Sequence, residues 1–172
     1  MQISLKKIEV SQSIELHELA VQTFDETFAS QNTPKNMQWY FETTMTLENT
    51  EKELSNPDSY FYFAFHHEQI IGYLKLNFNA AQTETVLENT AFEIERIYIK
   101  REFQDKGFGS ELFNTALHLG SEKGYNQMWL GVWKHNDKAI HFYKKKGLKA
   151  FDQHIFQLGN DAQTDILMRL DF

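Results

Sequence analysis

The spacing of hydrophobic and polar residues divides the chain into strands and helices. A period of two is typical of strands, and a period near 3.6 is typical of helices. Strands are predicted at 3–10, 60–66, 70–78, 91–100 and 128–133, followed by two more in 148–172 on either side of 159–161. Helices are predicted at 11–29, from Pro34 to about Leu47, at 107–123 and at 136–146, with a short turn at 51–54. The order β-α-α-β-β-β-α-β-α-β-β indicates an α/β fold, with a mixed, twisted sheet and helices on both faces.

The strand predicted at 91–100 departs from strict alternation. Its apolar residues fall at Phe92 and Ile94, and then at Ile97 and Ile99. The parity slips once, at Glu95-Arg96. A β-bulge produces such a slip, because one extra residue turns the later side chains to the other face. A strand that is buried on both faces, without a bulge, is the alternative interpretation.

A glycine-containing turn, Gln104-Asp105-Lys106-Gly107-Phe108-Gly109-Ser110, follows that strand and starts a helix. Glycine lets the backbone approach a ligand closely, because it has no Cβ. The first amides of a helix lack intrahelical acceptors and present the positive end of the helix dipole to an anion. The pattern predicts a phosphate-binding turn, although a plain helix-starting turn would have the same order of elements.

Composition limits the kind of protein. The 172 residues are enough for one domain, and without a linker or repeat we place all of 1–172 in a single domain. Because cysteine is absent, disulfides, thiolate metal sites and a cysteine nucleophile are excluded. A net charge of −7 disfavours nucleic acid and suits a cationic substrate. No apolar run is long enough for a membrane helix or a signal peptide, so we expect a cytoplasmic protein with no membrane partner.

Two motifs resemble those of the GCN5-related N-acetyltransferases, the GNAT superfamily. The segment 104–109 resembles the Gln/Arg-x-x-Gly-x-Gly/Ala coenzyme A loop of that family. The segment 136–148 resembles Asn-x-x-Ala-x-x-Phe-Tyr-x-x-x-Gly-Phe, with Leu148 in place of the last Phe. Segments 72–77, 81–84 and 161–165 are similar to bacterial spermidine/spermine N-acetyltransferases of the PaiA type. The resemblance implies a mostly antiparallel sheet of six to seven strands, about four helices, and a V-shaped splay between the fourth and fifth strands.

The resemblance also implies acetyl-CoA as co-substrate, lying in the V between 92–100 and 128–133. Backbone groups of Ile97, Tyr98 and Ile99 would pair with its pantetheine arm. The other residues expected to bind it are Gln104, Asp105, Lys106, Gly107, Phe108, Gly109, Ser110, Asn136, Lys138, Phe142 and Tyr143. Alternative roles stay open for Asn136 as a helix N-cap, for Lys138 as a surface lysine and for Phe142 in the core.

Within that resemblance, Tyr143 is the candidate general acid that protonates the leaving thiolate. Glu95, at the predicted bulge, is the candidate general base, and Glu93 is the alternative. A base is needed because a primary ammonium has a pKa near 10.4. A buried tyrosine and ion-paired glutamates are the competing interpretations. Without cysteine we expect direct transfer to the amine, with no acyl-enzyme.

The expected acceptor is a polyamine, held by carboxylates and aromatic faces. The candidates are Glu26, Trp39 and Trp133, together with Tyr40, for which a role in the core is the favoured interpretation. No histidine spacing is typical of a metal site, and none is expected. Two alternative functions stay open. One is the acetylation of another amine, such as a protein N-terminus, a lysine or a drug-like amine, and the other is a non-catalytic regulator that binds acyl-CoA. A homodimer formed through the tail strands is also possible.

Overall fold

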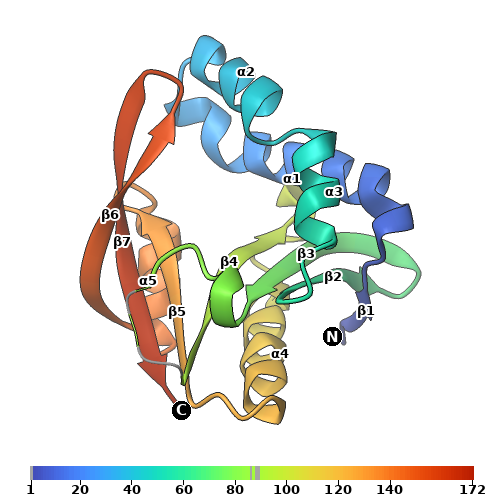
Figure 1. Cartoon of the computed structure of the whole chain (residues 1–172), viewed down its shortest axis with the longest axis vertical. Coiled ribbons are helices and arrows are strands. Elements are labelled where there is room, and N and C mark those ends of the chain that lie inside the picture. Colours follow the sequence, from blue (N-terminus) through green and yellow to red (C-terminus); the bar gives the residue numbers. More distant parts are fainter. Residues whose placement is uncertain (1, 86, 88–89) are drawn as a thin grey trace.

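A mixed β-sheet runs through the centre of the protein (Figure 1). The computed structural model describes residues 2–85, 87 and 90–172. Within these residues seven strands form one sheet in the order β1-β2-β3-β4-β5-β7-β6. The strands are β1 (Ser4–Lys7), β2 (Ser59–His66), β3 (Gln69–Asn77), β4 (Ala91–Ile99), β5 (Gln127–Trp133), β6 (Lys149–Leu158) and β7 (Asp161–Asp171). All neighbouring strands are antiparallel except β4 and β5, which run parallel.

Helices cover both faces of this sheet. The helices α1 (Ser13–Phe28), α2 (Pro34–Thr43) and α3 (Leu47–Leu54) lie on one face. The helices α4 (Phe108–Glu122) and α5 (Asp137–Lys145) lie on the opposite face. The predicted α/β class and sheet are confirmed, and the described residues contain one more α-helix than the four expected.

The additional helix corrects the prediction for residues 34–54. A single helix was expected to reach about Leu47, but α2 ends at Thr43. The Thr46 side chain then accepts a hydrogen bond from the amide of Asn49 at 3.1 Å and so caps α3. An N-cap residue adopts an extended backbone, which interrupts a helix and starts another. The short turn expected at 51–54 is therefore the end of α3.

The first strand is also shorter than predicted. It was expected at 3–10, but β1 ends at Lys7 and the chain enters a 3-10 turn at Val10–Gln12. The Gln12 side chain accepts the amide of Glu9 at 3.1 Å, as in a capping box. Further along the chain, the loop between the strands predicted at 70–78 and 91–100 begins with a 3-10 turn, Asn79–Ala81. Residues 86, 88 and 89 of that loop lie outside the described residues.

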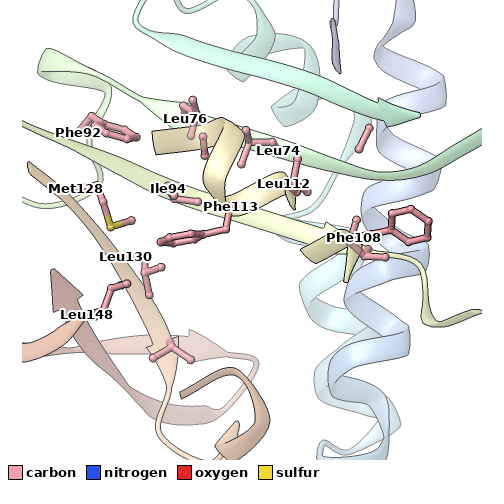
Figure 2. Close-up of a cluster of buried hydrophobic side chains, with 14 of the residues drawn as sticks. Leu74, Leu76, Phe92, Ile94, Phe108, Leu112, Phe113, Met128, Leu130 and Leu148 are labelled. Carbon is pink, nitrogen blue, oxygen red and sulfur yellow. The ribbon is translucent and has the colours of Figure 1, made fainter. Parts of the chain in front are cut away.

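The larger part of the core lies between α4 and the centre of the sheet. Figure 2 shows Leu112 and Phe113 of α4 beside Leu74 and Ile94 of the sheet, and all four side chains are at most 1% exposed. Farther along the helix, a Cβ on Gly120 would overlap the ring of Phe92. This close packing fixes α4, and with it the turn that precedes the helix, against β4.

The predicted bulge and splay are both present. Lys75 of β3 pairs with Arg96, and Leu76 pairs with Ile94, so Glu95 is the extra residue on β4. The parallel pairing of β4 with β5 covers three residue pairs and ends at Glu93 and Trp129. The strands separate beyond that point, as Figure 1 shows. A wedge therefore opens in the middle of the sheet.

The strand β6 forms one edge of the sheet. The tip of the β6–β7 hairpin reaches α2, where the amide of Asn160 donates to Asn36 at 3.4 Å (Figure 1). An edge strand offers unpaired backbone groups to a second chain. A homodimer formed through the tail strands remains a prediction.

Candidate active site

The wall of the wedge formed by β4 has a free backbone edge. On its other edge, Ile97, Tyr98 and Ile99 pair with Leu74, Tyr73 and Gly72 of β3. Among the residues described, no strand pairs with the β5-facing edge from 94 to 99. Its N–H and C=O groups can therefore pair with an extended ligand that enters the wedge.

The turn after β4 adopts a backbone that suits glycine. Gly107 is the N-cap of α4 and has φ +84°, and Asp105 has φ +60°. Left-handed conformations of this kind alternate with right-handed ones in backbone concavities that bind anions. No atom lies within 4 Å of a Cβ built on Gly107 or Gly109. The space in front of the turn is therefore open.

Five successive amides in this turn point to an anion site. The amides of Ser110 and Glu111 donate to the carbonyl of Gly107 at 3.1 and 3.2 Å. Across residues 2–85, 87 and 90–172, the N–H groups of 105–109 have no acceptor. Free amides at a helix N-terminus attract negative charge, because the helix dipole adds to the N–H dipoles.

Two lysines from the region of α5 flank the same turn. The Lys138 ammonium lies 2.9 Å from Asp105 Oδ1 and 3.4 Å from Gln104 Oε1. The Lys146 ammonium donates to Ser110 at 2.5 Å and to Asn114 at 2.9 Å. The sequence predicted Lys138 but not Lys146, because nothing in the run 144–146 distinguishes the lysine that turns toward α4. Together the two lysines add positive charge beside the free amides.

Glu95, the extra residue of the bulge, lies in an ionic network. Its oxygens lie 2.5 Å from the Lys75 ammonium and 3.1 Å from the Arg96 guanidinium. Both cations also bind Glu53 of α3, Lys75 at 3.2 Å and Arg96 through two hydrogen bonds of 2.8 Å. Burial raises the pKa of Glu95, but Arg96 and Lys75 together outweigh burial and leave that pKa below its ordinary value. Glu95 is therefore a firmly ionised carboxylate.

Glu93 lies at the vertex of the wedge in a different environment. Asn77 Nδ2 donates to Glu93 at 3.0 Å and to Glu95 at 2.5 Å, so it joins the two carboxylates. Thr83 donates to Glu93 through its amide at 2.8 Å and through its hydroxyl at 2.5 Å. Burial and the charge of Glu95 raise the pKa of Glu93 more than these hydrogen bonds lower it. The pair thus combines one carboxylate of lowered pKa with one of raised pKa.

Comparison with known proteins identifies the family. The family model described as "Acetyltransferase (GNAT) family" matches residues 14–148. The chain belongs to the GNAT family of acetyltransferases. An uncharacterised N-acetyltransferase of Lactobacillus delbrueckii subsp. lactis is 42% identical over 148 residues, which cover 86% of this chain and 85% of the relative.

More distant relatives extend the comparison. A spermidine N(1)-acetyltransferase of Thermoplasma acidophilum is 26% identical over 156 residues, covering 88% of this chain and 91% of the relative. The crystal structure of the PaiA N-acetyltransferase from T. acidophilum in complex with coenzyme A covers 100% of both chains with a TM-score of 0.80 and 24% identity. This structural likeness confirms the GNAT fold.

Tyr143, the candidate acid of this GNAT chain, is half-buried on α5. Its ring lies 6.3 Å from that of Phe113 and 5.3 Å from that of Phe142. Burial raises the pKa of Tyr143, so the phenol keeps its proton at neutral pH. Among the described residues its hydroxyl has no hydrogen-bond partner. The hydroxyl can therefore donate its proton to a ligand.

The remaining residues predicted for the co-substrate divide between binding and packing positions. Asn136 accepts the amide of Ala139 at 3.2 Å, so it caps α5. Phe142 packs edge-on against Phe113, and the Phe108 side chain is 2% exposed in the core. Only the backbone amide of Phe108 is therefore available to a ligand.

A cavity of roughly 210 Å³ lies between the C-terminal end of α1 and the start of α5. It is lined by Thr27, Phe28, Gln31, Trp133, His135, Asn136, Asp137 and Lys138. The structure thus brings three of the predicted residues, Trp133, Asn136 and Lys138, to one cavity. The indole of Trp133 packs edge-on against Phe28 at 6.2 Å.

The other predicted acceptor residues lie elsewhere. The carboxylate of Glu26 accepts the amide of Arg101 at 2.8 Å, which ties α1 to the chain just before the phosphate turn. Trp39 is 41% exposed on α2, and no interaction among the described residues joins it to Glu93 or Glu95. Neither residue meets the carboxylate pair.

No group of three His, Cys, Asp or Glu side chains in 2–85, 87 and 90–172 is arranged to hold a metal ion. Of the helices described, none combines the length and the apolar composition that a membrane span requires.

Proposed function

We propose that this protein transfers the acetyl group of acetyl-CoA directly to a primary amine of a polyamine such as spermidine or spermine. The observation that carries the proposal is the continuous surface from the free edge of β4 to the free amides of 105–109. A long ligand with an amide-containing arm and a diphosphate fits such a surface, because the strand edge suits the arm and the helix N-terminus suits the anion.

The residues that would hold acetyl-CoA follow from this geometry. Ile97, Tyr98 and Ile99 offer backbone groups to the arm, and the turn 104–110 offers its amides to the diphosphate. Lys138 would exchange its contact with Asp105 for a phosphate oxygen, and Lys146 stands beside Ser110. Acetyl-CoA supplies the acetyl group as a thioester. The protein orients it toward the amine.

The incoming ammonium must lose a proton before it attacks. We assign that proton to the carboxylate pair of Glu93 and Glu95. A general base works best when its pKa is near the working pH, so the raised pKa favours Glu93 as the group that takes the proton, directly or through water. Glu95, the residue predicted from the sequence, keeps its charge and attracts the cation toward the wedge.

Tyr143 would protonate the departing thiolate. Its raised pKa keeps the phenol protonated, and its hydroxyl has no competing partner in the part of the chain described. A phenol in that state is a suitable general acid. The Asn136 amide group would help to align the arm from the start of α5.

The polyamine acceptor is supported by the carboxylate of Glu93 and by one relative. Lys75 and Arg96 offset the charges of Glu53 and Glu95, whereas the Glu93 carboxylate is hydrogen-bonded only to Asn77 and Thr83 and has no cationic partner among the described residues. The relative from T. acidophilum is named a spermidine acetyltransferase. A protein N-terminus, a lysine side chain and a drug-like amine are the competing acceptors. A regulator that binds acyl-CoA without turnover is the competing class of function.

An assay of CoA release tests the proposal. We expect turnover with spermidine and spermine that exceeds turnover with lysine peptides and aminoglycosides. Strong release with another amine, and none with either polyamine, would contradict the acceptor. Tight binding of acetyl-CoA without release by any amine would favour the regulator.

The Tyr143→Phe variant tests the acid. We expect kcat to fall about 100-fold, because general acid catalysis contributes on that order. The dissociation constant of CoA, measured by calorimetry, should stay within about twofold, because binding does not need the proton. Tyr60→Phe, on β2, is the matched control, and an equal loss in both variants would refute the assignment.

Substitution of the carboxylates separates their roles. Glu93→Gln should remove the acidic limb of the profile of kcat/KM against pH, because its raised pKa places this titration closest to neutrality. Glu95→Gln should raise KM for the amine and keep that limb, but move it to lower pH, because the charge of Glu95 helps to raise the pKa of Glu93. If the limb disappears only in Glu95→Gln, Glu95 is the base.

A further inference from the structure

Three side chains form a row across the C-terminal half of the sheet. Trp133 of β5 pairs with Asp165 of β7, and Asp165 pairs in turn with His154 of β6. Side chains of directly paired residues lie on the same face of an antiparallel sheet. The row therefore faces one side, and Trp133 also lines the cavity beside the wedge.

Asp165 is the anionic centre of this row. His154 Nε2 lies 3.4 Å from Asp165 Oδ2, and His154 Nδ1 lies 3.0 Å from Glu84 Oε1. Among the residues that the structure describes, Asp165 Oδ1 has no hydrogen-bond partner. The side chain of Asp165 is 17% exposed, so this oxygen can still receive a donor.

Gly131 leaves space in front of Asp165. A Cβ on Gly131 would lie 3.6 Å from both Asp165 Oδ2 and His154 Nε2. The position of Gly131 is exposed, and the absence of a side chain there leaves the side of Asp165 that faces β5 more open. A ligand can therefore approach Asp165 over the backbone of β5.

Tyr40 of α2 packs against the same face of the sheet. Tyr40 is 6% exposed, and its ring stacks on Phe24 at 4.6 Å and packs on Phe156 at 5.6 Å. Phe156 lies two residues from His154, so it shares the face of the row. Within the described residues the Tyr40 hydroxyl has no hydrogen-bond partner.

Charged groups from β4, β7 and α3 affect the pKa of Tyr40. Burial raises the pKa of Tyr40 to about 12, Arg96 lowers it, and Glu95, Glu53 and Asp165 each raise it. The ion pairs at the bulge and Asp165 of the row therefore both act on the Tyr40 hydroxyl. Because the Tyr40 hydroxyl has no hydrogen-bond partner among the described residues, it can accept a donor from a ligand.

We propose that Asp165, Tyr40 and Trp133 form a second ammonium site, which holds the distal cation of a diamine or polyamine while its proximal amine lies at the carboxylate pair. The proposal rests on the proposed function and adds to it the residues that distinguish polyamines from monoamines. Asp165 Oδ1 and the Tyr40 hydroxyl accept the N–H donors, and the indole of Trp133 covers the alkyl chain. His154 holds the other oxygen of Asp165.

A comparison of a polyamine substrate with a monoamine substrate tests the site. Steady-state kinetics with spermidine and with n-butylamine are measured for the wild type, Asp165→Asn and Tyr40→Phe. In Asp165→Asn we expect KM for spermidine to rise about tenfold or more, because a hydrogen bond to a charge is lost. KM for n-butylamine should change less than about twofold, because a monoamine has no distal cation. Tyr40→Phe should raise KM for spermidine by a smaller factor.

Asp171→Asn, at the exposed end of the same strand, is the matched control and should behave as the wild type. Tyr40→Phe removes only a hydroxyl, so it still tests the site if Asp165→Asn does not fold. Equal effects on spermidine and n-butylamine, or none on either, would overturn the second site while polyamine acetylation stands. If the wild type acetylates another amine but not spermidine, the proposed function itself fails.

Discussion

The two sides of the wedge are built in different ways. The side proposed for CoA comes from one continuous segment, in which β4, the glycine turn and the start of α4 span residues 91–110. The side proposed for the acceptor draws on α2, α3, β3, β4, β5 and β7, with Tyr40 and Asp165 separated by more than half of the chain. Local geometry creates the first side, and tertiary packing creates the second.

Because of this difference, substitutions on the two sides of the wedge should affect different properties of the protein. A change in the turn alters the backbone itself but leaves the distant carboxylates in place. A change in the acceptor side disturbs a buried network that also joins α3 to the sheet through Glu53. We therefore expect separable effects on CoA binding and on stability.

The largest effect on stability is expected for Lys75→Met. Lys75 is 4% exposed and contacts Glu53 and Glu95, so its loss leaves buried carboxylates with fewer cations. Breaking a buried ion pair costs about 3 kcal/mol or more. The free energy of unfolding, from urea denaturation, should fall by that amount, whereas the CoA affinity should change little. Lys52→Met, on the exposed side of α3, is the control, and an equal loss there would contradict the role of the network.

The same network controls stability in acid. Because the pKa of Glu95 is lowered on folding, the unfolded chain binds more protons as the pH falls through the ordinary Glu range near 4.3. Glu95 therefore stabilises the fold above that range and loses this contribution as the pH falls toward its lowered pKa. The fall in unfolding free energy below about pH 4.3 should be shallower in Glu95→Gln than in the wild type. Parallel pH profiles for the two proteins would contradict this origin of the acid sensitivity.

A smaller effect is expected in the turn. Gly107→Ala places a Cβ on a left-handed backbone, which costs about 1 kcal/mol of stability. Strain in the turn also moves the free amides, so the CoA affinity should fall about tenfold for a loss of similar size. Gly109→Ala distinguishes backbone strain from a steric clash with the ligand, because Gly109 has no positive φ and its substitution causes no backbone strain. It should weaken CoA binding through its Cβ without a loss of stability.

The smallest effect is expected for Lys138→Ala. The pair of Lys138 and Asp105 is highly exposed, and such pairs contribute less than about 1 kcal/mol. Stability should hardly change, whereas CoA affinity should fall severalfold and do so less at high salt, because salt screens exposed charges. An unchanged affinity at low salt would place Lys138 outside the site.

The sequence predicts the first side of the wedge well and the second side poorly, for a physical reason. The parity slip at Glu95 and the spacing of Gly107 and Gly109 are local signals, so the bulge and the turn are visible along the chain. Asp165 and Tyr40 carry no local signal, because only the packing of α2 on the β6–β7 hairpin places Tyr40 on the face of the sheet that carries Asp165. Glu26 and Trp39, which the sequence also suggests for the acceptor, lie away from the carboxylate pair, and their role in binding stays a prediction.

The short parallel junction of β4 with β5 has a mechanical consequence. Strands β1 to β4 and strands β5 to β7 form two antiparallel halves of the sheet. In the described part of the sheet, only the parallel pairing of β4 with β5, which covers three residue pairs and ends at Glu93 and Trp129, joins the two halves. A ligand that binds between the separated strands and contacts both of them would restrain the motion of one half relative to the other. Its binding should slow amide hydrogen exchange in both halves at once, including at backbone positions that it never touches.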